Sequence, residues 1–61
     1  MTEAKWDQVA DAVAARLKKK EKFFDAVKNG LADCGIYDYK DNASYYCKEM
    51  GKRLGKRKKS R

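Results

Sequence analysis

The sequence predicts an all-α protein, and three observations support this class. Apolar residues recur at helical spacing over residues 6–31, and a second series with the same kind of spacing runs over residues 43–54. No Gly or Pro occurs before Gly30, so nothing local interrupts the first series. The 61 residues suffice for one small domain, near the size at which a single hydrophobic core is marginal.

The first predicted helix covers residues 3–30. Its apolar series has spacings of three, four and seven residues, and Lys20 stands at the one heptad position that breaks it. Thr2 is the predicted N-cap, with acidic residues close behind it. Gly30 is the first stop signal, in the left-handed position after the helix, and Gly35 is the alternative stop. The series consists of Trp6, Ala10, Val13, Leu17, Phe24, Val27 and Leu31.

The second predicted helix is capped by Asp41 or Asn42 and has one apolar face. Two glycines near its end each cost about 1 kcal/mol relative to Ala, so we expect the ordered helix to end at Leu54. The predicted organisation is a helical domain over residues 1–54 and a flexible basic tail over residues 55–61. The apolar face consists of Ala43, Tyr46, Cys47, Met50 and Leu54, and the glycines are Gly51 and Gly55.

The two predicted helices differ in length, at about 42 Å and about 21 Å for a rise of 1.5 Å per residue. Folding the second helix onto the first leaves part of the first apolar face without a partner in the chain. We therefore expect a helical hairpin that dimerises into a bundle. The alternative is a break near residues 18–21 that closes a compact three-helix bundle. The side chains predicted for the dimer or partner interface are Trp6, Val9, Val13 and Leu17.

The positive charge lies at one end of the chain. Residues 1–47 hold eight bases and eight acids, whereas residues 48–61 hold eight bases and one acid, so the second segment carries the whole net charge of +7. Three of its lysines stand four residues apart on one helical face, which predicts a positive ridge that contacts phosphates. The predicted nucleic-acid-binding residues are Lys48, Lys52, Arg53, Lys56, Arg57, Lys58, Lys59 and Arg61.

The predicted function is therefore non-specific binding of DNA or RNA. The basic segment has no Asn, Gln or aromatic residue to read or stack on bases. The alternative is a small helical adaptor or inhibitor that binds a partner protein through the apolar face of the first helix. A third interpretation pairs the basic segment with the acidic stripe of Glu3, Asp7 and Asp11, although exposed ion pairs contribute only about 0 to 1 kcal/mol each.

The tyrosines occur in and after a predicted loop over residues 35–41. Tyr46 fits the apolar face of the second helix and is expected in the core. Tyr37, Tyr39 and Tyr45 either pack the loop or form an aromatic binding surface for nucleic acid or protein.

Several classes of protein are not expected. The chain has no His, and no Ser or Cys has acid-base partners in the sequence, so we predict neither an enzyme nor a cofactor. Cys34 and Cys47 cannot supply a four-ligand zinc site within one chain and are expected to be reduced thiols. No long apolar run or secretory signal occurs, so the expected location is cytoplasmic, without a transmembrane segment.

Overall fold

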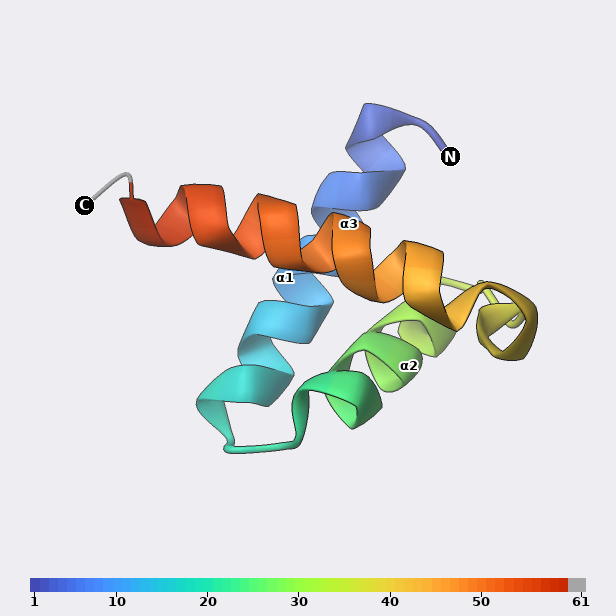
Figure 1. Cartoon of the computed structure of the whole chain (residues 1–61), viewed down its shortest axis with the longest axis horizontal. Coiled ribbons are helices and arrows are strands. Elements are labelled where there is room, and N and C mark those ends of the chain that lie inside the picture. The colour runs from blue at the N-terminus through green and yellow to red at the C-terminus, as the bar shows by residue number, and fades with distance from the viewer. Residues whose placement is uncertain (60–61) are drawn as a thin grey trace.

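The computed structural model describes the backbone of residues 1–59 and the side chains of residues 1–56. The described residues form three helices and no strands: α1 (Glu3–Lys18), α2 (Phe23–Asp33) and α3 (Tyr39–Lys59) (Figure 1). The all-α prediction is confirmed, and the three-helix alternative fits. The prediction of one helix over residues 3–30 is wrong.

The break between α1 and α2 lies in the charged stretch that the alternative named. Lys19 caps α1, and Lys20 has a positive φ of 67°, which turns the chain out of the helix. The backbone N–H groups of Lys19 and Lys20 donate to the carbonyls of Arg16 and Leu17, at 3.0 and 2.9 Å. A charged stretch has no apolar face to bury, so ending the helix here costs little and allows α2 to pack back on α1.

The side chain of Arg16 holds this turn. Its Nη1 donates to Glu21 Oε2 at 3.3 Å, and its Nη2 donates to Asp33 Oδ2 at 2.6 Å. The guanidinium thus joins α1 to the connection and to the last residue of α2. The hydrogen bond to Asp33 is the main cause of the raised pKa of Arg16.

Gly30 does not end a helix, which corrects the first predicted stop. It lies buried inside α2, and a Cβ at this position would lie 2.5 Å from Val13 Cγ2 and 3.2 Å from the Val13 backbone nitrogen. The glycine therefore permits the close approach of α1 and α2. α2 ends at Asp33, and Gly35 adopts a φ of +81°, so the alternative stop is confirmed.

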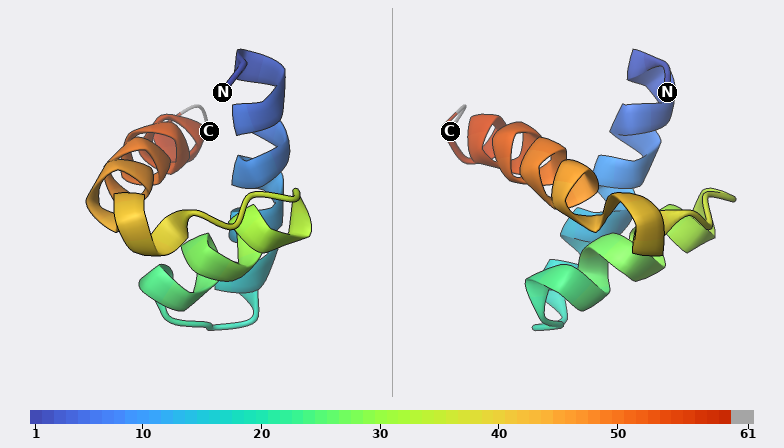
Figure 2. Two further views of the ribbon diagram at one scale, coloured as in Figure 1. Left: turned by 90° about the vertical axis from the view of Figure 1, so that its right-hand side faces the viewer. Right: turned by 45° about the vertical axis from the view of Figure 1, so that its right-hand side comes forward.

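One core joins the three helices, and each helix contacts the other two (Figures 1 and 2). Trp6, Val9 and Val13 are buried in this core, so the prediction that they lack a partner within the chain is wrong. The break lets α2 and α3 cover the stripe that one long helix leaves open, and Leu17 is half-buried against the core. The buried apolar residues are Trp6, Val9, Ala10, Val13, Ala26, Val27, Leu31, Tyr46 and Met50.

α3 differs from the predicted second helix at both ends. It begins at Tyr39 and contains a kink at Asn42, where φ is −132° and ψ is 28°. The Asn42 side chain donates to Asp38 Oδ2 at 3.1 Å, so the predicted cap residue ties the kink to the preceding loop. The helix continues past Leu54 to Lys59, although α3 contains both glycines. The part of the tail prediction that concerns residues 60–61 lies outside the described residues.

Candidate nucleic-acid interface

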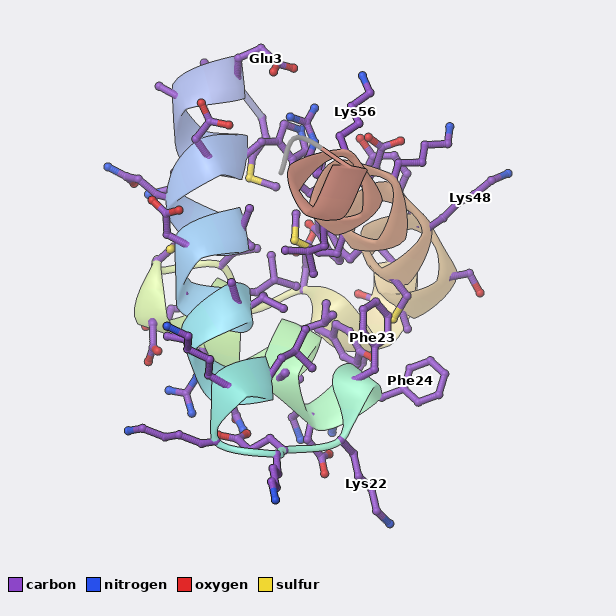
Figure 3. All side chains as sticks on the ribbon, turned by 90° about the vertical axis from the view of Figure 1, so that its left-hand side faces the viewer. Glu3, Lys22, Phe23, Phe24, Lys48 and Lys56 are labelled. Carbon is purple, nitrogen blue, oxygen red and sulfur yellow. The ribbon has the colours of Figure 1, made fainter. Side chains whose placement is uncertain are left out.

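Lys48, Lys52 and Lys56 are exposed on one side of α3, and we call these three residues the lysine face. They recur every four residues, a step of about 40° on a helix with 3.6 residues per turn, so the three side chains lie within about 80° of one another. Figure 3 shows the side chains of Lys48 and Lys56 projecting from α3 into solvent. Within the described residues, none of the three forms an ion pair with a carboxylate. The lysine face is therefore open to an external anion.

Of the other five predicted phosphate-binding residues, only Arg53 has a described side chain. Arg57, Lys58 and Lys59 have a helical backbone as part of α3, and their side chains lie outside the described part of the structure. Arg61 lies outside it altogether. Among the predicted phosphate-binding residues with described side chains, the structure therefore brings together the three of the lysine face. Arg53 is the fourth such residue.

Arg53, which the sequence predicts as a phosphate-binding residue, points toward α1 in the structure. Its Nη1 donates to Glu3 Oε2 at 3.0 Å, and its Nη2 donates to Glu3 Oε1 at 2.8 Å. Its Cζ lies 5.0 Å from the ring centroid of Trp6, at cation–π distance. One residue beyond Lys52 is a rotation of about 100° around the helix, which carries Arg53 toward α1. Arg53 therefore fastens α3 to α1 through Glu3 and Trp6.

The electrostatics of the pair agree with this geometry. The hydrogen bond from Arg53, and then its positive charge, lower the pKa of Glu3 below the ordinary value of 4.5. Lys56 adds a smaller effect in the same direction. The pKa of Arg53 is raised, chiefly by the same hydrogen bond. Glu3 is thus already paired with a cation, so it is a weak competitor for the lysine face.

An open cleft of about 710 Å³ separates the start of α1 from the C-terminal half of α3. Its walls carry both signs of charge, and the paired side chains of Glu3 and Arg53 are among them. This mixture does not favour a small ligand of either charge. The lining residues are Glu3, Asp7, Ala10, Glu49, Gly51, Lys52, Arg53, Gly55 and Lys56.

The four tyrosines divide between core and surface. Tyr46 is buried, as predicted, and its hydroxyl donates to Asp38 Oδ1 at 2.6 Å, which raises the pKa of Tyr46 to about 12. Tyr39 is half-buried with its hydroxyl 3.5 Å from Cys47 Sγ, and this hydrogen bond raises the pKa of Tyr39 to about 12. Tyr37 and Tyr45 are 80% and 53% exposed. Loop packing thus describes Tyr39, whereas Tyr37 and Tyr45 present their rings at the surface.

Phe24 is a surface aromatic that the apolar series placed on the buried face. It is 66% exposed, and it projects from the start of α2 on the same side of the molecule as Lys48 (Figure 3). Phe23 instead packs against the core, and the two ring centroids lie 6.0 Å apart. Val27 and Leu31 of the predicted series are buried in α2, so Phe24 is the member of the series that α2 places at the surface.

The described residues include two thiols and other possible metal ligands. Cys34 and Cys47 are free and half-buried. Among the described residues, no three His, Cys, Asp or Glu side chains gather as metal ligands. Among the same residues, no helix has the length and apolar character to cross a bilayer.

Comparison of the chain with protein-family models, curated proteins and solved structures finds no match in any of the three.

Proposed function

We propose that this chain is a small nucleic-acid-binding protein that contacts phosphates through its C-terminal Lys/Arg segment without reading base sequence. The observation that carries the proposal is the lysine face: Lys48, Lys52 and Lys56 are exposed in register on α3 and have no ion-pair partner among the described carboxylates. A polyanion is the ligand class that matches a row of like charges.

The charge balance within the fold supports an external partner. Like charges four residues apart repel and weaken a helix, and bound phosphates remove that repulsion. Glu3 is paired with Arg53, and Glu49 lies 3.8 Å from the Nε of the same residue. Both carboxylates therefore pair with Arg53, and Glu3 interacts with Lys56 only through a weaker electrostatic effect. Within the described residues, the lysine face forms no ion pair of its own.

The competing adaptor hypothesis depended on the apolar face of the first helix. Trp6, Val9 and Val13 are at most 4% exposed, so a partner protein has little access to them in this fold. A homodimer through the same face would also require the core to open. Binding of phosphates by the lysine face needs neither event, which favours the nucleic-acid proposal.

The test compares the intact chain with a variant in which Lys48, Lys52 and Lys56 are all replaced by Gln. Binding to random duplex and single-stranded DNA and RNA is measured at several salt concentrations. We expect the log-log salt slope on duplex DNA to become shallower by about 2 to 3 in the variant, since each lost phosphate contact contributes about 0.9.

A matched control variant replaces Lys18, Lys28 and Lys40, which are also exposed, by Gln. It has the same net charge as the first variant but keeps the lysine face. We expect it to retain most of the salt slope of the intact chain. Equal losses in the two variants would show that overall charge, and not the lysine face, governs binding.

A further inference from the structure

Tyr45 lies on the same side of α3 as the lysine face. It precedes Lys48, Lys52 and Lys56 by 3, 7 and 11 residues, and at about 100° per residue the last two lie within about 20° of its direction. The kink at Asn42 comes before this stretch, so helical register holds from Tyr45 onward. Lys48 is offset from Tyr45 by about 60°, so an exposed aromatic ring and three lysines lie along one side of α3.

Packing holds the ring of Tyr45 at the surface. Its centroid lies 5.9 Å from that of Trp6 in an edge-on arrangement with an interplanar angle of 69°, and 5.5 Å from that of Tyr46. Both neighbours are buried, yet Tyr45 itself remains 53% exposed. The ring is thus positioned before any ligand arrives, which reduces the entropy lost on binding.

We propose that Tyr45 stacks on an unpaired base while the lysine face neutralises the phosphates of the same strand, so that the protein takes single-stranded nucleic acid in preference to duplex. This inference rests on the proposed function. Base–aromatic stacking is tolerant of sequence, because every base has a π-face. In a duplex the bases stack on one another, so the ring adds affinity only for a single strand.

The chain offers a matched control in Tyr37. It is more exposed than Tyr45, at 80%, and belongs to the loop between α2 and α3. That loop lies at the opposite end of α3 from the C-terminal segment (Figure 1). An exposed tyrosine without lysines in register should contribute nothing to stacking.

The experiment measures binding of labelled oligonucleotides, single-stranded and duplex with the same random composition, to the full chain. The variants are Tyr45→Leu, which keeps apolar cover over Trp6, Tyr45→Phe, which keeps the ring, and Tyr37→Leu. We expect Tyr45→Leu to weaken single-strand binding at least about fivefold, the lower end of base–aromatic stacking, with duplex binding unchanged. Tyr45→Phe and Tyr37→Leu should bind like the parent chain.

Single-strand binding by Tyr45→Leu at the parent affinity would overturn the stacking role, as would an equal loss on duplex or a loss in Tyr45→Phe. The proposed function would still hold after any of these results if the variant with Lys48, Lys52 and Lys56 replaced by Gln loses affinity for nucleic acid. If the parent chain binds neither form of nucleic acid, or binds anionic lipid vesicles as tightly, both proposals fail. Thermal unfolding followed by the fluorescence of Trp6, the one tryptophan of the chain, verifies that each variant is folded.

Discussion

Arg53 on α3 and Glu3 in the first turn of α1 form a two-point ion pair between residues 50 positions apart, with N···O distances of 3.0 and 2.8 Å. The guanidinium also lies over Trp6, at 5.0 Å from the ring centroid. Paired carboxylate and aromatic contacts suit the planar guanidinium and not an ammonium. Among the described side chains of the basic segment, Arg53 thus holds the fold, whereas the lysine face forms no ion pair.

Neighbouring positions on α3 should therefore respond differently to the same kind of substitution. We expect Lys52→Gln to weaken nucleic-acid binding without changing the thermal midpoint, because Lys52 is exposed and forms no ion pair with a described carboxylate. Arg53→Gln should lower the midpoint and change the salt slope less. Calorimetry and binding on both variants test this, and a reversed pattern would contradict the division of roles.

The ion pair also predicts a pH dependence. Because the folded pKa of Glu3 lies below 4.5, the unfolded chain binds the proton more tightly than the folded chain. The contribution of Glu3 to stability is present above pH 4.5 and is lost as the pH falls through its folded value. Unfolding measured against pH should show a smaller acid loss for Glu3→Gln than for the parent chain. Identical acid profiles would exclude Glu3 as a contributor.

Gly30 and Gly51 provide a matched pair for packing. A Cβ on Gly30 would lie 2.5 Å from Val13 Cγ2, whereas a Cβ on Gly51 meets nothing within 4 Å. We expect Gly30→Ala to destabilise the fold by about 1 to 3 kcal/mol through overpacking. Gly51→Ala should stabilise it by about 0.5 to 1 kcal/mol through helix propensity. Denaturant unfolding measures both, and a stabilising Gly30→Ala would refute the close contact of α1 with α2.

The hydrogen bond from Tyr46 to Asp38 predicts an effect at alkaline pH. Its folded pKa of about 12 exceeds the ordinary 10.0, so the folded state holds the phenol proton more tightly. This contribution is complete below pH 10.0 and is lost as the pH rises toward about 12. Tyr46→Phe should cost about 1 kcal/mol at neutral pH, with the difference vanishing in alkali. Tyr37→Phe, on an exposed loop residue, is the control and should leave the stability at neutral pH unchanged.

Two local signals in the sequence predicted local structure correctly. Thr2 caps α1 by accepting from the Lys5 backbone N–H at 3.2 Å, and Gly35 takes the left-handed turn. The periodic apolar residues of both segments placed Trp6 and Tyr46 on inward faces. These features depend on a few neighbouring residues, which a single sequence contains.

Features that depend on distant residues were missed. The apolar residues of α1 and α2 follow one heptad repeat across the break, although they belong to two separate helices. Periodicity alone therefore predicted one long helix, which left Val9 and Val13 exposed. In the sequence, a glycine that ends a helix looks the same as a glycine that allows another helix to pack closely. Only the contact of Gly30 with Val13 in the structure shows that Gly30 has the second role. Arg53 turns inward because Glu3 and Trp6 lie opposite it, a relationship visible only once α1 and α3 are packed.

The most direct test of the lysine face is an NMR titration of the full chain with short single-stranded oligonucleotides, followed at the backbone amides and lysine ammonium groups. We predict that the largest shifts map to Tyr45, Lys48, Lys52 and Lys56 on α3. Shifts centred instead on the charged connection over residues 18–22, or a spectrum unchanged by the oligonucleotide, would contradict it.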